Sequence, residues 1–451
     1  MESKQHQRNT LAVTQGFVWG AATAAYQIEG AAAHGGRTPS IWDTFARTPG
    51  KTFNGDTGDD ACRHYELVET DLELMDWLGI DAYRYSVSWS RLLPNGVGEP
   101  NPEAINFYNR LIDGLLERGI QPWLTMYHWD LPQVLHDRGG WQSRQSIEWF
   151  GHYAQTLVNL FGDRIKNWIT INEPHCVAWF GYYRGWFAPG ITDLQASIDV
   201  SHHLLLAHGR AVRIVKDSDP TAQVGISLGL TPVEAASGSP EDIAAATRQD
   251  GYDLRWFLDP LHGRGYPQDI VQQLGVEVPV VDDDLDVIAT ATDFLGVNFY
   301  LRQIVKAAPA DGFLDLEGID PEGATFTDTG WEVYPAGLRN LCERLHSDYS
   351  PAALYITENG SAWLDVVTAV GEIEDHERVD YLRQHLDAVS EIVDAGIPLK
   401  GYFAWSLLDN FEWNSGYGKR FGLFYVDYTT FHRTPKLSAS WFRNYISKSR
   451  D

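Results

Sequence analysis

The sequence predicts an α/β protein that folds as a single (β/α)8 TIM barrel with extended loops after its strands. Short β-branched apolar runs alternate with segments of helical apolar spacing, which is typical of a parallel sheet. Eight strand-like runs are found, and eight such units can close into a barrel. No Pro- or Ser-rich linker divides the 451 residues. We therefore expect one domain over residues 15–446, after a flexible N-terminal tail of residues 1–14.

The first half of the chain repeats a strand followed by a helix with recognisable start and stop signals. After a small-residue strand at 17–24, Asp59 and Asp60 can cap a helix that Gly79 ends. Apolar residues recur along it at helical spacing: Tyr65, Val68, Leu72, Met75 and Leu78. Further strands are predicted at 81–89, 121–127 and 169–172, with helices from about Pro102 to Gly119 and from Ser143 to Gly162. Pro174 cannot continue the fourth strand.

The second half continues the alternation less regularly. Strands are predicted at 224–228, 294–299, 353–357 and 402–406, and helices at about 197–216 and 376–395. Residues 303–330, rich in Gly, Asp and Pro, are predicted to form a long surface insertion. A doubly wound open sheet is the alternative, but no Gly-x-Gly-x-x-Gly follows the first strand, so a dinucleotide cradle is not indicated.

Composition narrows the range of partners. A formal net charge of −26 disfavours nucleic-acid binding, since a polyanion repels phosphate backbones. Three scattered cysteines give no disulfide framework or zinc motif and favour a reducing compartment. The polar N-terminus does not resemble a secretory signal, and no run reaches the ~18 apolar residues of a membrane span. We expect a cytoplasmic protein with a small-molecule partner; a homo-oligomer is compatible with the sequence.

Chemically capable side chains gather where the predicted strands end. In such barrels the carboxyl ends of the strands carry the active site. Any one of these residues has a structural explanation, such as a surface charge, a paired arginine or a core histidine. Their convergence on one barrel mouth favours a functional site instead. The residues are Gln27, Arg84, His128, Asn172, Glu173, Asn298, Tyr300, Glu358 and Trp405.

Two of these residues are glutamates at the ends of different strands, a combination suited to glycoside hydrolysis. Arg84 and Tyr300, if they lie near Glu358, favour its ionised form and a nucleophilic role. Glu173, facing that charge without an evident cation, would keep its proton and act as a general acid. The 17 tryptophans would fill the core or stack on sugar faces.

The sequence lacks the residue patterns of metal-dependent and serine hydrolases. The adjacent His202 and His203 diverge on a helix, no His-Glu-x-x-His occurs, and no serine lies in a Gly-x-Ser-x-Gly elbow. Cys176 follows Glu173 closely but has no evident base, so a buried position is favoured over a nucleophilic one. We expect no cofactor and no metal.

Five motifs, in this order, resemble those of glycoside hydrolase family 1, the retaining β-glucosidases built on (β/α)8 barrels. The resemblance covers nearly the whole chain, from Phe17 to about Phe442. The motifs are Ala-Tyr-Gln-Ile-Glu-Gly at 25–30, Tyr-His-Trp-Asp-Leu-Pro-Gln at 127–133, Thr-Ile-Asn-Glu-Pro at 170–174, Ile-Thr-Glu-Asn-Gly at 356–360 and Trp-Ser-Leu-Leu-Asp-Asn-Phe-Glu-Trp at 405–413.

The resemblance implies an exo-acting retaining β-glucosidase that uses Glu358 as nucleophile and Glu173 as acid/base. Its substrates would be terminal non-reducing β-D-glucosyl residues of cellobiose, oligosaccharides and aryl or alkyl β-glucosides, with β-galactosides or β-fucosides in addition. Asn172 would hold the sugar 2-hydroxyl. The remaining sugar hydroxyls would be bound by Gln27, His128, Glu412 and Trp413, and Trp405 would lie beneath the sugar ring. Arg84 and Tyr300 would orient Glu358 and tune its charge, and Asn298 would support Glu173. Trp331 would lie on the aglycone side.

Departures from the family pattern are few. Ile171 stands where the family often has Phe, and the presence of Glu173 argues against the thioglucosidase branch. The segment after Pro174, with His175, Trp179 and Arg184, is expected to border the leaving-group site.

Three alternatives stay open. A 6-phospho-β-glycosidase would need a phosphate pocket, which Lys419 resembles in part, although Glu412 would repel phosphate. A non-catalytic sugar-binding barrel is disfavoured because both glutamates are present. No residue separates a hydrolase from a transglycosylase.

Overall fold

Eight parallel strands close into a barrel in the computed structural model, which describes residues 16–309 and 313–450. This confirms the predicted fold class, and all eight predicted strands are present. The predicted tail, residues 1–14, lies outside the described residues. In their order around the barrel the strands are β1 (Val18–Ala22), β11 (Leu399–Trp405), β10 (Leu354–Asn359), β7 (Phe294–Asn298), β5 (Gln223–Gly229), β4 (Asn167–Asn172), β3 (Gln121–Tyr127) and β2 (Ala82–Ser86).

Closure depends on pairing between the first and last barrel strands. Val18 of β1 lies opposite Gly401 of β11, and the register continues to Ala22 opposite Trp405. A Cβ atom on Gly20 would lie 2.3 Å from a ring carbon of Phe403, so glycine lets this aromatic ring fill the barrel interior. The Phe403 ring centroid lies 5.1 Å from that of Trp123. The barrel is therefore a packed core.

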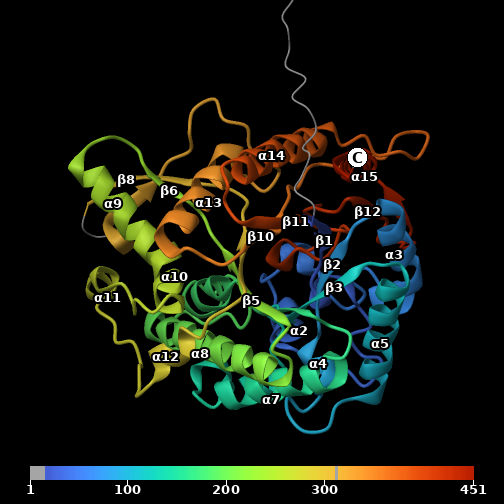
Figure 1. The fold of residues 1–451 in the computed structure, drawn as a ribbon, viewed down its shortest axis with the longest axis horizontal. Coiled ribbons are helices and arrows are strands. Elements are labelled where there is room, and N and C mark those ends of the chain that lie inside the picture. The colour runs from blue at the N-terminus through green and yellow to red at the C-terminus, as the bar shows by residue number, and fades with distance from the viewer. Residues whose placement is uncertain (1–15, 310–312, 451) are drawn as a thin grey trace, which may run out of the picture.

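Helices surround the barrel because each carries an apolar stripe that packs on the outer face of the strands. Figure 1 shows α3 and α5 on one side, α7 and α8 on a second, and α13 and α14 on a third. The longer helices are α3 (His64–Leu78), α5 (Pro102–Glu117), α7 (Ser146–Phe161), α8 (Leu194–Ser218), α13 (Pro335–Tyr349), α14 (His376–Asp394) and α15 (Leu437–Ser449).

Shorter helices lie in the connections. These are α1 (Ala25–Ile28), α2 (Ile41–Ala46), α4 (Trp89–Leu92), α6 (Gln133–His136), α9 (Pro240–Asp250), α10 (Trp256–Leu261), α11 (Gln268–Leu274) and α12 (Asp284–Ile288). Single 3-10 turns add η1 (Phe53–Gly55), η2 (Gly140–Gln142), η5 (Phe313–Asp315) and η6 (Trp413–Ser415), and two π-helical segments add η3 (Cys176–Tyr183) and η4 (Gly251–Arg255).

One predicted helix start was wrong. Asp59 and Asp60 do not cap α3, which begins at His64 after Arg63 adopts a left-handed conformation with φ of 52°. Asp59 instead accepts a hydrogen bond from Arg47 Nη2 at 2.6 Å, and Asp60 accepts one from Arg63 Nη2 at 3.1 Å. The turn before α3 is held by backbone hydrogen bonds from Cys62 N to Ile28 O and from Tyr65 N to Glu29 O, each 3.1 Å, so the chain becomes helical only at His64.

The stretch predicted as a surface insertion, residues 303–330, contributes regular structure within its described part. β8 (Gln303–Ala307) pairs with β9 (Leu316–Gly318) and with β6 (Val233–Ala235) from the preceding connection. A separate hairpin joins β12 (Phe424–Val426) to β13 (Arg433–Pro435). Across the part of the chain that the structure describes, no helix is both long and apolar enough to cross a bilayer.

A buried ion network fastens the C-terminal segment to the barrel. The ammonium group of Lys436 contacts Asp365 and lies 2.7 Å from Asp409 Oδ1, and all three side chains have no solvent exposure. Arg378 and Arg420 complete the network through Asp365 at 3.0 Å and Asp409 at 2.6 Å. Each buried charge thus has an opposite charge in contact, which offsets part of the cost of desolvation.

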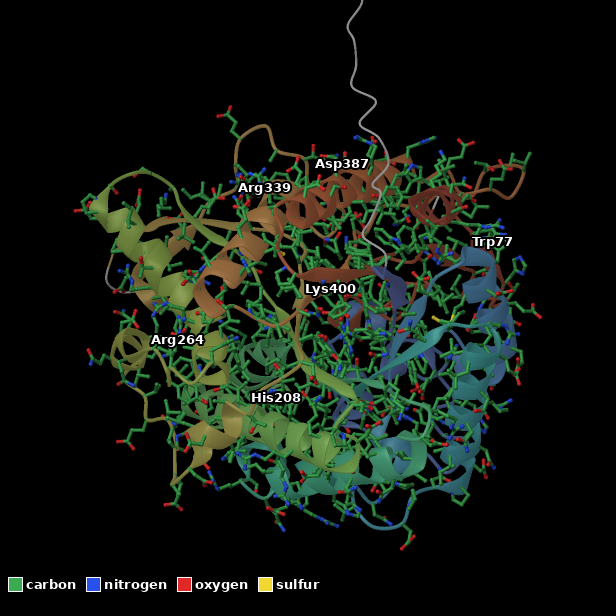
Figure 2. The ribbon with its side chains drawn as sticks, viewed as in Figure 1. Trp77, His208, Arg264, Arg339, Asp387 and Lys400 are labelled. Atoms are coloured by element: carbon green, nitrogen blue, oxygen red, sulfur yellow. The ribbon has the colours of Figure 1, made fainter. Side chains whose placement is uncertain are left out.

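Replacing Lys436 by methionine should destabilise the fold, because Asp365 and Asp409 would each lose one cation while staying buried. We expect a loss of about 3–5 kcal/mol in the free energy of unfolding, measured by chemical denaturation. Lys400 (labelled in Figure 2) is exposed at the start of β11, so Lys400→Met is the matched control and should change stability little. Equal effects of the two substitutions would contradict a stabilising role of the network.

Candidate functional site

A cavity of about 480 Å³ opens at the carboxyl ends of the barrel strands, a size typical of small-molecule sites. Most of the side chains predicted from sequence line it: His128, Glu173, Asn298, Tyr300, Trp331, Glu358, Trp405, Glu412 and Trp413. The other three, Gln27, Arg84 and Asn172, are fully buried behind its wall and contact residues that line it. The structure therefore brings the predicted residues together in one site.

Glu358 lies on β10, where the register with β7 shifts between Ile356 and Glu358. Such irregularities change the direction in which a side chain points. Arg84 Nη1 lies 2.6 Å from Glu358 Oε1, and the Tyr300 hydroxyl donates to Oε2 at 2.7 Å. Burial raises the pKa of Glu358, while Arg84 and Tyr300 oppose that rise because both stabilise the carboxylate.

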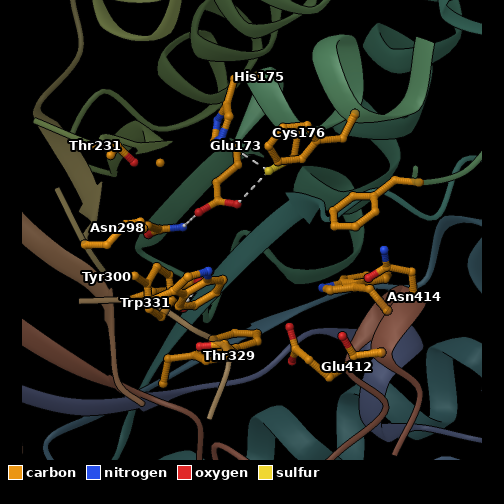
Figure 3. A pocket seen from close by; sticks show the side chains of 18 of the residues that line it. Glu173, His175, Cys176, Thr231, Asn298, Tyr300, Thr329, Trp331, Glu412 and Asn414 are labelled. Atoms are coloured by element: carbon orange, nitrogen blue, oxygen red, sulfur yellow. Dashed lines mark hydrogen bonds between the residues drawn. The ribbon is translucent and has the colours of Figure 1, made fainter. Parts of the chain in front are cut away.

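Glu173 directly follows β4 and has a positive φ of 45°, an uncommon conformation for a residue other than glycine. Asn298 Nδ2 donates to Oε1 at 2.8 Å, and the Cys176 thiol lies 3.3 Å from Oε2 (Figure 3). Burial and the nearby charge of Glu358 raise the pKa of Glu173 to about 7. Because Arg84 contacts Glu358 and not Glu173, the ionised form is stabilised more strongly at Glu358 than at Glu173.

Asn172 connects the two glutamates through a hydrogen-bonded chain. Its Oδ1 accepts from Arg84 Nη2 at 2.5 Å and from Asn298 Nδ2 at 3.0 Å. Its Nδ2 donates to His128 Nε2 at 3.1 Å. Since a carbonyl oxygen has two lone pairs and an amide nitrogen two hydrogens, one N–H of Asn172 is left for a further partner.

His128 presents a hydrogen-bond donor whose position follows from this contact. Burial lowers its pKa well below the ordinary value, so the ring is neutral at pH 7. Because Nε2 accepts the bond from Asn172, the hydrogen must be on Nδ1. That atom is buried and has no hydrogen-bond partner among the described residues.

The far side of the cavity holds a third carboxyl group. Gln27 Nε2 donates to Glu412 Oε2 at 3.3 Å and to Asn410 Oδ1 at 3.0 Å. Burial and the charge of Glu358 raise the pKa of Glu412 to about 8. At neutral pH Glu412 therefore keeps its proton and can both donate and accept hydrogen bonds.

Aromatic rings form much of the remaining wall. His128 stacks on Trp405 and Trp413, with centroid separations of 5.8 and 5.9 Å. Trp129 contacts Trp413 at 4.5 Å, and both residues have positive φ angles, 79° and 49°. Positive φ costs free energy at a bulky residue, so the surrounding structure must hold both tryptophans in place.

Sequence reasoning missed part of the cavity entrance. Trp186, which is 55% exposed, lines the cavity with Phe180 and Phe187. The aromatic-rich run that follows Pro174 was the available signal. Of the residues expected there, His175 lines the cavity, but Trp179 does not: it is 1% exposed and stacks on Tyr252 at 4.6 Å.

Comparison with known proteins is consistent across sequence and structure. The family described as Glycosyl hydrolase family 1 matches residues 9–450. Beta-glucosidase A of Thermotoga maritima is 43% identical over 445 residues, covering 98% of this chain and 99% of that protein. Beta-glucosidase A of Acetivibrio thermocellus is 42% identical over 438 residues, covering 96% and 98%.

Solved structures give the same result. A family 1 β-glucosidase from Thermotoga maritima has a TM-score of 0.93 at 42% identity, covering 96% of this chain and 98% of that chain. The AHE enzyme from Alicyclobacillus herbarius has a TM-score of 0.95 at 45% identity, covering 98% and 99%. The Thermotoga enzyme has also been solved in complexes with deoxynojirimycin and isofagomine lactam.

Replacing Glu358 by glutamine should lower the pKa of Glu173 from about 7 towards its ordinary value, because the neighbouring negative charge is removed without changing the shape of the side chain. Carbon NMR of glutamate labelled at the carboxyl carbon would follow the titration. Glu343→Gln, on the exposed face of α13, is the control and should leave the titration of Glu173 unchanged. An unaltered pKa in the Glu358 variant would contradict the charge coupling.

Proposed function

The chain belongs to glycosyl hydrolase family 1, and we propose that it is an exo-acting β-glucosidase that hydrolyses its substrate with retention of configuration. The observation that carries this proposal is the pair Glu173 and Glu358, which line one cavity in opposite electrostatic surroundings. The surroundings of Glu358 favour a carboxylate that attacks, and those of Glu173 favour a carboxyl group that donates a proton, which are the two roles that double displacement requires.

In the first step, the Glu358 carboxylate forms a bond to the anomeric carbon as the bond to the leaving oxygen breaks. Glu173 transfers its proton to that oxygen, and the aglycone departs as an alcohol. In the second step, Glu173 takes a proton from water, whose oxygen attacks the anomeric carbon and releases Glu358. Water supplies the hydrogen and hydroxyl that the products gain, so the reaction balances without a cofactor.

Arg84 and Tyr300 act through Glu358. Both donate hydrogen bonds to its oxygens and therefore keep it ionised before the attack. As the carboxylate becomes an ester its charge falls, and these contacts weaken. They stabilise the carboxylate again as it departs, which favours hydrolysis of the covalent intermediate.

The sugar is recognised by the polar groups that the cavity gathers. The remaining N–H of Asn172 is a donor for the 2-hydroxyl, and the imidazole of His128, which lines the cavity, binds a neighbouring hydroxyl. Gln27 and Glu412 contact the hydroxyls on the opposite side, together with the indole of Trp413. Trp405 lies beneath the sugar ring, while Trp331 lies beside Tyr300, 5.1 Å between ring centroids, and contacts the aglycone.

A 6-phospho-β-glycosidase is the less favoured alternative. Lys419 lines the cavity, but its Nζ lies 3.0 Å from Asp328 Oδ2, so its charge is already balanced. A phosphate group would also add negative charge to a cavity that already holds the Glu358 carboxylate, and Lys419 is the only lysine or arginine among the described residues that line it. The unphosphorylated glucoside is therefore the substrate that we propose, with cellobiose and short β-glucans as its natural forms.

The domain and location are proposed on simpler grounds. Residues 15–446 act as a single catalytic domain, since the barrel strands are drawn from both ends of that range.

A cytoplasmic location is supported by the cysteines: Cys62, Cys176 and Cys342 are all buried and free, as expected in a reducing compartment.

Proton NMR during hydrolysis of an aryl β-D-glucoside tests the proposal directly. We expect the β-anomer of glucose to appear first, because two inversions at the anomeric carbon restore its configuration. The Glu358→Gln variant is the control and should release almost no glucose while keeping its thermal stability. The α-anomer appearing first would mean inversion and would overturn the role of Glu358.

Replacing Glu173 by alanine should slow substrates unequally. Phenyl β-glucoside has a poor leaving group that needs protonation, and we expect formation of its glycosyl-enzyme to slow by a factor on the order of 10²–10⁴. The first step for 2,4-dinitrophenyl β-glucoside should slow far less, because its leaving group departs as an anion. Pre-steady-state release of the phenol measures this step. Equal losses for both substrates would contradict the acid role.

A further inference from the structure

Three side chains with metal-ligating atoms converge beside the cavity. Glu173, His175 and Cys176 each offer one such atom, and these atoms all lie within 4.8 Å of one another. Cys176 Sγ lies 3.3 Å from Glu173 Oε2 and 3.2 Å from His175 Nε2 (Figure 3). Among the described residues, 16–309 and 313–450, no other group of three or more His, Cys, Asp or Glu side chains brings its ligand atoms this close together.

The spacing suits a small four-coordinate cation. Zinc bonds of about 2.3 Å to sulfur and about 2.0–2.1 Å to nitrogen or oxygen place tetrahedral ligand atoms roughly 3.3–3.6 Å apart. The separations from Cys176 Sγ, 3.3 Å to Glu173 Oε2 and 3.2 Å to His175 Nε2, are close to this range, and the ligand atoms of Glu173 and His175 lie within 4.8 Å of each other. A mixed thiolate, imidazole and carboxylate set also selects zinc over magnesium or calcium, which prefer oxygen ligands.

The surrounding chain holds the three ligands in position. Gly229 of β5 is packed against two of them: a Cβ atom there would lie 2.3 Å from His175 Cε1 and 2.9 Å from Glu173 Oε1. The imidazole of His175 also contacts Phe180 and Phe257, with centroid separations of 5.8 and 6.4 Å. Glycine at position 229 thus makes room for both side chains, and aromatic rings restrict the imidazole.

We propose that Glu173, His175 and Cys176 form an inhibitory binding site for Zn²⁺. On binding, the thiol proton of Cys176 and the carboxyl proton of Glu173 pass to solvent, and the sulfur, an imidazole nitrogen and a carboxylate oxygen bond to the metal. The fourth position faces the cavity, which all three residues line, and takes a water molecule. The ion is a regulator and takes no part in the reaction.

Inhibition follows from the double use of Glu173 and rests on the function proposed above. A metal-bound carboxylate cannot carry the proton that the leaving oxygen needs, nor accept one from water in the second step. Both half-reactions therefore stop while the metal is bound. Removing the metal with a chelator restores the carboxyl group unchanged, so the inhibition is reversible.

Isothermal titration calorimetry with ZnCl₂ tests the binding site, using the full chain without reducing agent. We expect the wild type to bind Zn²⁺ at one site that Cys176→Ser either lacks or fills with at least tenfold weaker affinity. His175→Gln should show a similar loss. Cys342→Ala is the matched control, because Cys342 is also buried and free but lies on α13, outside the cluster. Binding by Cys176→Ser as tight as that of the wild type would overturn the site.

Hydrolysis rates measured in parallel test the inhibitory role. Each variant is compared with its own metal-free rate, and EDTA should restore the wild type fully. The zinc concentration for half-inhibition should rise at least tenfold in the Cys176 and His175 variants and stay unchanged in Cys342→Ala. Zinc that occupies the site without slowing hydrolysis would overturn the inhibitory role. A chain that binds zinc but never hydrolyses β-glucosides would instead contradict the proposed function, and the calorimetry would still decide the site.

Discussion

A single buried cation organises the site. Arg84 has no solvent exposure, so each of its donors must find an acceptor within the protein. Its guanidinium binds Thr125 on β3, Asn172 on β4, and both Thr357 and Glu358 on β10. One side chain of β2 therefore fixes the polar ends of three other strands, two of which carry or directly precede a glutamate of the proposed mechanism.

The difference between the two glutamates arises from this constraint. Both are buried, and burial alone would raise both pKa values. The guanidinium compensates Glu358, and the charge of Glu358 then acts on Glu173. The same two residue types thus acquire different proton affinities because only one of them contacts the cation. A barrel mouth that held two glutamates without this asymmetry would have no division between attacking group and proton donor.

The position of Glu173 also allows a metal ion to bind its carboxyl group and block its role in the mechanism. The short segment that follows β4 turns through a left-handed conformation and places His175 and Cys176 against the same carboxyl group. A proton carrier must be accessible and able to change its charge, and those are properties that a metal ligand shares. The inhibitory site that we propose uses the chemistry of the mechanism itself, so no second cavity or conformational change is needed.

The sequence by itself determined the barrel, because eight strand-like runs and the glycines and capping residues between them are local signals. It also determined which residue types end each strand, and hence that Glu173 and Glu358 would share an edge with Arg84 and Tyr300. Local signals failed where contacts between distant residues prevailed, as before α3, where the backbone of Cys62 and Tyr65 bonds to that of Ile28 and Glu29 and the helix begins only at His64. Trp186 and the cluster of His175 with Cys176 were likewise decided by tertiary structure. Their roles depend on which way a turn directs each side chain. The imidazole of His175 packs against Gly229 and Phe257 from elsewhere in the fold and against Phe180 of its own segment, which also contacts Trp186.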